Sequence, residues 1–215
     1  MSHYSKNNPG LPVPVQRAGF TLVEFLVSIG IVFVILTLVI SKQSIYTEKA
    51  ALTNLADDIS LSIFQSQAYG VGVREFSQGT SIFNVGYGLT FSLLASGSNI
   101  AFLYFADRNG NYIYDGDWTC SIGGASECLN KTAITRGNYI DSLCVVRTSG
   151  ADLCNVGRVD ISFVRPNTEA QLRFFSNGGN PYSPANIAGA KIGLKSSSGA
   201  TVSVVVYTSG QISVQ

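Results

Sequence analysis

Residues 20–40 read FTLVEFLVSIGIVFVILTLVI, and Glu24 is the one ionisable side chain among them. At about 1.5 Å of rise per residue, a helix of this length spans about 30 Å, the thickness of the hydrocarbon core of a bilayer. A cleaved secretory signal normally has a shorter apolar core, of about 7–15 residues, followed by a small-residue cleavage site. Because SKQSIYTEK follows here instead, we predict a retained, single-pass transmembrane helix.

The preceding residues 1–19, MSHYSKNNPGLPVPVQRAG, contain three of the six prolines and no acidic residue. Lys6 and Arg17 make this segment basic. Such a composition cannot bury a hydrophobic core. We interpret residues 1–19 as a basic tail, separate from the folded part of the chain.

Residues 41–70 keep the spacing of a helix beyond the apolar run, with no proline among them. The apolar positions that recur on one face are Ile45, Leu52, Leu55, Ile59 and Ile63. Gly70 and Gly72 then supply a stop signal. We predict an amphipathic second half of one long helix, packed on its own domain.

From about residue 80 the apolar pattern changes to a period of two, which is typical of strands. Leu89, Phe91 and Leu93 alternate with polar or small residues, and the turn SGSN leads to a partner strand at 100–105. Further candidate strands are residues 139–147, 159–164, 171–175, 191–194, 201–207 and 211–214. We therefore predict an α+β chain: a long N-terminal helix, membrane-spanning in its first half, packed on an antiparallel β-sheet domain within residues 71–215.

The charge balance argues against nucleic acid as a partner. The chain has 14 Lys and Arg against 13 Asp and Glu. Lys6, Arg17 and Glu24 are the charged residues that precede residue 41, so the body of the chain is neutral. Strong phosphate binding needs several clustered cations, because affinity comes largely from counterion release. The sequence contains no such cluster.

Four cysteines, Cys120, Cys128, Cys144 and Cys154, all follow the apolar run, and none forms the C-x-x-C pair of a zinc or redox site. Outside the cytoplasm, two disulfides are expected. Four cysteines allow three pairings; pairing Cys120 with Cys128 and Cys144 with Cys154 closes the shortest loops. The sequence leaves the pairing open, and free buried thiols are the alternative.

One segment has the oxygen ligands of a calcium site, at Asp107, Asn109, Asn111, Asp115 and Asp117. A calcium ion takes 6–8 oxygens from a tight loop. The spacing differs from that of an EF-hand, because the glycine falls at the fourth place and no Glu closes the twelfth. The alternative is an Asx-rich turn whose side chains bond their own backbone. Calcium is therefore a candidate cofactor, and no other cofactor is expected.

Catalysis has little support, since the one histidine, His3, lies in the basic tail. The rest of the chain therefore cannot form a Ser-His-Asp or Cys-His site, and we predict that the protein is not an enzyme. Aromatic residues at Tyr104, Tyr112, Tyr114 and Trp118 could form a binding surface, although aromatics at strand positions more often fill the core. A membrane-anchored envelope enzyme remains the alternative class.

Residues 17–25, RAGFTLVEF, resemble the prepilin signature shared by type IV pilins and type II secretion pseudopilins. The match includes the small-Gly-Phe junction, the Thr-Leu-Val-Glu continuation and the apolar segment, and it is strong over residues 14–45. The resemblance implies that prepilin peptidase cuts between Gly19 and Phe20 on the cytoplasmic side and then methylates the new amine of Phe20. Residues 1–19 would be the cleaved leader. The absent side chain of Gly19 would let the backbone enter a narrow active site.

The same resemblance gives Glu24 a role in assembly, as the partner of the N-terminal amine of a neighbouring subunit. Two unit charges about 4 Å apart attract by about 4 kcal/mol at an effective dielectric constant of about 20, before desolvation is subtracted. The alternative is a carboxylate that simply reaches the lipid headgroups. The implied partners are prepilin peptidase, other pilin or pseudopilin subunits, an inner-membrane assembly platform and, before assembly, membrane lipid.

Residues 157–179 and 201–214 look like the corresponding parts of H-type minor pseudopilins and FimT-like minor pilins. The resemblance implies a structural subunit, held first in the bacterial inner membrane with its C-terminal domain extracytoplasmic, and later in a filament in the periplasm or at the cell surface. The sequence leaves open whether the filament serves a pilus, secretion or competence. A filament-displayed adhesin or DNA-binding pilin is the alternative within this class.

Overall fold

The computed structural model describes residues 19–72, 85–121 and 126–215, in two compact units, Met1–Ser44 and Ile45–Gln215. One helix, α1 (Leu22–Val71), contributes to both units and is the single helix within the described ranges. It ends between Gly70 and Gly72, as the two glycines predict. A Cβ on Gly70 would lie 2.2 Å from the carbonyl oxygen of Phe163, so this position also allows the close approach of a strand. The predicted α+β class is confirmed.

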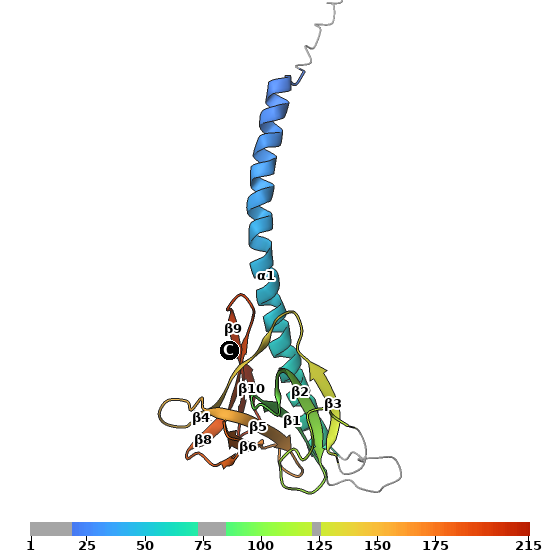
Figure 1. Cartoon of the computed structure of the whole chain (residues 1–215), viewed down its shortest axis with the longest axis vertical. Helices are drawn as coiled ribbons and strands as arrows, with labels where there is room; N and C mark the ends of the chain where they lie inside the picture. Colours follow the sequence, from blue (N-terminus) through green and yellow to red (C-terminus); the bar gives the residue numbers. More distant parts are fainter. Residues whose placement is uncertain (1–18, 73–84, 122–125) are drawn as a thin grey trace, which may run out of the picture. The chain divides into compact units, whose positions relative to one another are not determined.

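The unit Ile45–Gln215 contains two antiparallel sheets (Figure 1). The six-stranded sheet has the order β3-β2-β1-β5-β6-β7, with β1 (Gly86–Ser92), β2 (Ser98–Asp107), β3 (Cys128–Ala133), β5 (Val156–Phe163), β6 (Gln171–Ser176) and β7 (Pro181–Tyr182). The four-stranded sheet has the order β10-β9-β8-β4, with β4 (Tyr139–Arg147), β8 (Ile187–Lys195), β9 (Thr201–Tyr207) and β10 (Ile212–Val214).

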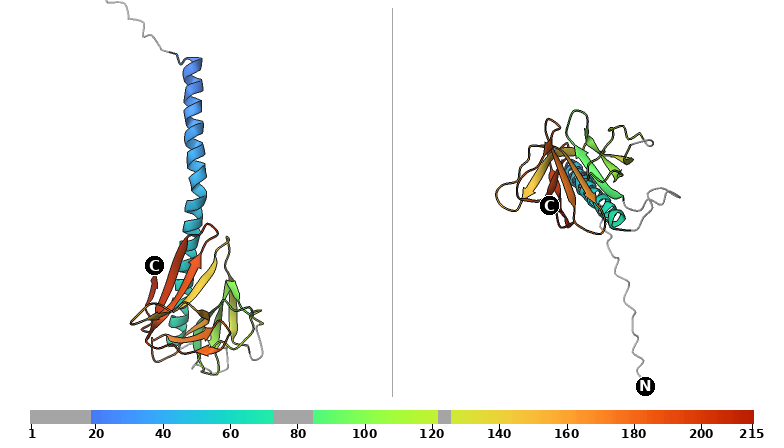
Figure 2. Two further views of the ribbon diagram at one scale, coloured as in Figure 1. Left: turned by 60° about the vertical axis from the view of Figure 1, so that its left-hand side comes forward. Right: turned by 90° about the horizontal axis from the view of Figure 1, so that it is seen from below.

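The second half of α1 lies between the two sheets, as the view from below shows (Figure 2). Its fully buried apolar side chains are spaced four, three and four residues apart, which places them on one face of the helix: Leu52, Ala56, Ile59 and Ile63. These residues belong to one hydrophobic cluster with Phe91 of the six-stranded sheet and Ile192 of the four-stranded sheet. The helix therefore completes the core of this unit.

Strand β1 is buried on both faces, which its alternating sequence does not indicate. Leu89 and Phe91 face the main core, whereas Thr90 and Ser92 on the other face are also fully buried. Residues 108–121 cover that second face, where Tyr114 packs on Leu103 and Phe105 of β2. Leu93, expected to continue the alternation, lies just beyond the strand.

Fully buried helix positions should carry most of the stability that α1 gives to this unit. Ile59→Ala is expected to lower the free energy of unfolding by about 2–5 kcal/mol, because it removes buried methylenes and leaves a cavity. Denaturant unfolding of the full chain, followed by fluorescence, measures this loss. The control is Phe64→Ala on the same helix, where the side chain is 59% exposed; its cost should stay within about 0.5 kcal/mol. Equal losses would contradict the assigned faces of α1.

Candidate functional site

The Gly19–Phe20 junction lies in non-helical, exposed backbone directly before α1. Thr21 is the N-cap of the helix: its Oγ1 accepts a hydrogen bond from the N–H of Glu24 at 3.2 Å, and its carbonyl accepts one from the N–H of Phe25 at 3.1 Å. Thr21 and Glu24 also have the spacing of a capping box. The cap holds the start of the helix just past the junction, so the junction itself stays exposed and outside the helix.

The segment Leu22–Ile40 of α1 is long and apolar enough to cross a membrane. Each of its side chains is exposed within the chain. Its two hydroxyl side chains are satisfied internally: the hydroxyl of Ser28 donates to the carbonyl of Glu24 at 2.7 Å, and that of Thr37 to the carbonyl of Phe33 at 2.8 Å. Internal satisfaction of polar groups is what a hydrocarbon environment requires.

Glu24 lies in the first turn of α1, where the helix dipole favours a negative charge. None of the ion pairs that join described residues includes Glu24; they link Arg158 to Asp160, Lys191 to Asp152 and Lys195 to Asp141. The carboxylate thus lies at an exposed position in the first turn of its own helix.

The candidate calcium ligands begin at Asp107, the last residue of β2, and the structure brings four of them together. Asp107 is buried and binds backbone amides: Oδ1 accepts from Gly110 at 2.8 Å, and Oδ2 from Tyr112 at 2.9 Å. Asp115 Oδ2 accepts from the side-chain amides of Asn109 at 2.7 Å and Asn111 at 2.8 Å. These contacts are those of the Asx-rich alternative.

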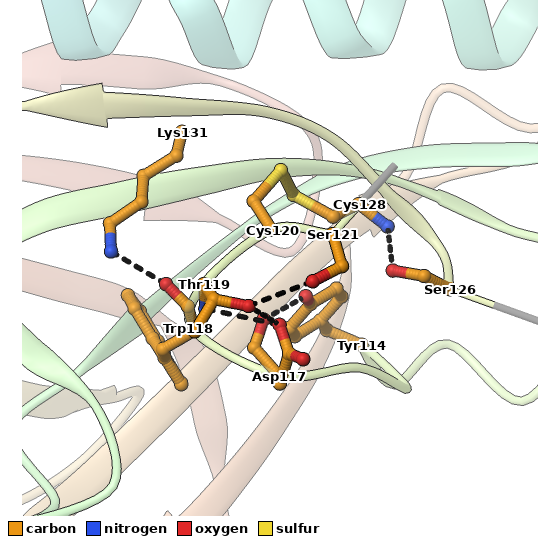
Figure 3. Close-up of a disulfide and its surroundings, with 9 residues drawn as sticks. All are labelled: Tyr114, Asp117, Trp118, Thr119, Cys120, Ser121, Ser126, Cys128 and Lys131. Carbon is orange, nitrogen blue, oxygen red and sulfur yellow. Dashed lines mark hydrogen bonds between the residues drawn. A yellow bond between two sulfur atoms is a disulfide. The ribbon is translucent and has the colours of Figure 1, made fainter. Parts of the chain in front are cut away.

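Asp117 stands apart from that group. Its Oδ1 accepts from the N–H and the hydroxyl of Thr119, at 3.0 and 2.6 Å (Figure 3). The hydroxyl bond holds the pKa of the Asp117 carboxyl below its usual value. Across the described ranges, no group of three or more His, Cys, Asp or Glu residues is placed to hold a metal ion. The calcium site stays a prediction.

Two further carboxylates, which the sequence does not single out, bind backbone amides of the loop that follows β2, residues 108–121. Glu127 is 2% exposed and accepts from the N–H groups of Arg108 and Asp115, both at 2.9 Å. Asp160 of β5 is fully buried; it accepts from the N–H of Tyr114 at 3.0 Å and forms an ion pair with Arg158. Burial raises the pKa of both carboxyls.

The four aromatic residues considered as a binding surface do not share one face. Tyr114 is 1% exposed and packs with Phe105 on the outer face of the six-stranded sheet. Tyr104 packs on the opposite side, in an aromatic group with Tyr69 and Tyr87. Trp118 packs on the cluster that contains Tyr114, and Tyr112 lies against the guanidinium of Arg173. The structure therefore assigns Tyr104, Tyr114 and Trp118 to packing.

Two disulfides are present, as predicted, and they link Cys120 to Cys128 and Cys144 to Cys154. The first ties the loop to the start of β3 (Figure 3). In the same region, the ammonium of Lys131 on β3 donates to the carbonyl of Trp118 at 2.6 Å. Covalent and polar links thus hold residues 114–120 against the sheet.

The buried carboxyls predict a pH dependence of stability. The pKa of Glu127 is raised in the folded chain, so the folded state retains a proton that the unfolded state has already released. This difference in bound protons favours the folded state at low pH, and the advantage is lost as pH rises through the raised pKa. The free energy of unfolding, measured by denaturant titration from about pH 4 to pH 8, should therefore fall less steeply with pH in Glu127→Gln than in the parent. The exposed Glu169→Gln is the control and should keep the parent slope. An unchanged slope in Glu127→Gln would contradict the assignment.

Comparisons with known proteins do not name this site. The chain matches no protein-family model, no curated protein and no solved structure. Its function must therefore follow from the chemistry of its own residues: an accessible Gly-Phe junction, a capped apolar helix with one carboxylate, and a disulfide-bonded unit with its own core.

Proposed function

We propose that this chain is a structural subunit, of the minor pilin or pseudopilin kind, that assembles through its N-terminal helix into a type IV pilus-like or type II secretion filament. The observation that carries the proposal is the segment Leu22–Ile40, in which each side chain is exposed although the segment is almost wholly apolar. An apolar helix without a partner in its own chain must be covered by lipid or by other helices. Lipid covers the segment while the protein is held in the membrane, and the helices of neighbouring subunits cover it in the polymer.

Processing between Gly19 and Phe20 supplies the second element of the proposal. Cleavage there leaves an amine on Phe20, one residue before the N-cap Thr21. Glu24 of a neighbouring subunit then has a cationic partner at a matching depth in the helix bundle. The resulting attraction favours one register among helices that are otherwise uniformly apolar, because an unpaired carboxylate among them would be costly.

The disulfides support an extracytoplasmic location for the unit Ile45–Gln215, since such bonds persist in oxidising compartments. In this proposal the protein waits in the bacterial inner membrane and then enters a filament in the periplasm or at the cell surface. Its partners are prepilin peptidase, other pilin or pseudopilin subunits and the assembly platform. The β9–β10 hairpin, which turns at Gly210 with a φ of 86°, is consistent with the terminal hairpin expected of the H-type branch.

Gly19 provides a clean test of processing, because a Cβ added there would meet no heavy atom within 4 Å. Co-expression with prepilin peptidase should give a mature protein that starts at methylated Phe20, as read by intact mass. Gly19→Val should remain unprocessed, since the peptidase must admit the added side chain. Gly30→Val is the matched control: a Cβ at Gly30 also meets nothing within 4 Å, and this variant should be cut normally.

Two results would count against the proposal. One is a parent protein that keeps Met1 or is cut near Ser44. The other is Gly19→Val processed to the same extent as the parent.

A further inference from the structure

The chain contains two Asn-Gly steps, one at Asn109 and Gly110 and the other at Asn177 and Gly178. In such a step the backbone nitrogen of the glycine can attack the side-chain carbonyl of the asparagine, because a glycine has no side chain to block the approach or to restrict the backbone. Both steps lie outside helices and strands, and both asparagines are exposed. Sequence and exposure therefore do not distinguish the two steps, whereas their hydrogen bonds do.

The step at Asn109 is held at both of its reacting groups. The side-chain amide of Asn109 donates to Asp115 Oδ2 at 2.7 Å, and its Oδ1 accepts from the N–H of Asn111 at 3.1 Å. The N–H of Gly110 donates to Asp107 Oδ1 at 2.8 Å. Attack requires this nitrogen to lose its proton, and a negative charge that develops beside a carboxylate is disfavoured. The folded loop thus protects Asn109.

The step at Asn177 lies in the turn between β6 and β7 and lacks such bonds. The N–H of Gly179 closes this turn by donating to the carbonyl of Ser176 at 2.8 Å. Within the part of the chain that the structure describes, neither the side chain of Asn177 nor the N–H of Gly178 takes part in a hydrogen bond. Both residues are exposed. The attacking nitrogen and its target are therefore neighbours that no other group restrains.

We propose that Asn177 is a site of spontaneous modification, at which its side-chain amide is converted to a carboxylate. The nitrogen of Gly178 loses its proton and bonds to the side-chain carbonyl carbon of Asn177. The bond from that carbon to the side-chain nitrogen breaks, and the nitrogen takes up the proton and leaves as ammonia. Water then opens the cyclic imide at either carbonyl, which gives aspartate or isoaspartate. Water is the only co-reactant, and the inference does not rest on the proposed function.

The modification changes one edge of the six-stranded sheet. Either product adds a negative charge to residues 176–180, which have no charged side chain. Isoaspartate also adds a carbon atom to the main chain of the turn, and the length of a turn fixes the register of the strands that it joins. Strand β7 pairs only through Phe174 with Tyr182 and Phe175 with Pro181. Isoaspartate at position 177 is therefore expected to loosen β7.

The test incubates the full chain, folded in detergent at mildly alkaline pH, and maps its peptides by fragment-ion mass spectrometry. We expect Asn177 to be deamidated at least about tenfold faster than Asn109, a ratio that corresponds to about 1.4 kcal/mol in the barrier. The same chain, reduced and unfolded in denaturant, loses the hydrogen bonds that hold Asn109. There the two rates should become similar, because the sequence step is the same.

Gly178→Ala tests the attacking atom. A Cβ at this position would lie 3.6 Å from Nδ2 of Asn180, an ordinary contact, so the fold should be kept. The added side chain hinders the approach of the nitrogen, and the modification of Asn177 should slow at least about tenfold. Asn180 is an internal control in both chains: it should stay intact, because Pro181 has no N–H to give up.

Three results would overturn the inference. The first is equal rates at Asn177 and Asn109 in the folded chain. The second is an Asn177 that stays intact in the folded chain but is modified in the unfolded one, since the turn would then protect it. The third is Gly178→Ala modified as fast as the parent, which would exclude attack by the nitrogen of residue 178.

Discussion

The exposed apolar surface of Leu22–Ile40 is the constraint on which the rest of the protein depends. Covering one large apolar side chain stabilises a protein by about 1.5–3 kcal/mol, and this segment leaves all of its side chains uncovered. The polar groups that it does contain are satisfied within the helix, through Ser28 and Thr37. Glu24 is the exception, because no described ion pair includes it. A single carboxylate in such a segment can fix the register of contacts between apolar helices that are otherwise uniform.

Helix α1 changes character where the boundary between the two compact units falls, at Ser44 and Ile45. Before that point, apolar residues surround the helix; after it, the buried apolar residues occupy one face, and Leu52, Ile59 and Ile63 are fully buried against two sheets. The unit Ile45–Gln215 therefore has a core of its own and does not need the apolar segment for stability. This separation allows the same helix to serve as an anchor and as part of a folded domain.

The parts of the fold that depend on local pattern could be predicted from the sequence. Strands Tyr139–Arg147 and Thr201–Tyr207 have the predicted bounds, because each is a short run rich in apolar residues that is flanked by glycine, serine or asparagine. Strand β3 was missed because CLNKTA lies at a sheet edge, where most of its residues are exposed and no alternation is needed. Strand β7 has only two residues and leaves no pattern.

The candidate site likewise has residues whose relation could be predicted from the sequence and residues whose partners could not. Gly19, Phe20 and Glu24 are neighbours in the sequence, so their relation to the helix start could be anticipated. The partners of Glu127 and Asp160 could not, because these carboxylates bind a loop that folds back from elsewhere in the chain. The Asp and Asn oxygens after β2 could serve a metal ion or backbone amides equally well by spacing, and only the folded loop shows that Asp107 binds amides.

Assembly of Glu24→Gln under active processing tests the central claim most directly. We expect this variant to be cut before Phe20 like the parent, to remain in the membrane and not to enter filaments, because no carboxylate meets the amine of its neighbour. Glu169→Gln, on the exposed surface of the other unit, should enter filaments normally. Filaments of Glu24→Gln in parent amounts would contradict the pairing between Glu24 and the amine of Phe20 and remove the argument for a fixed register of the helices.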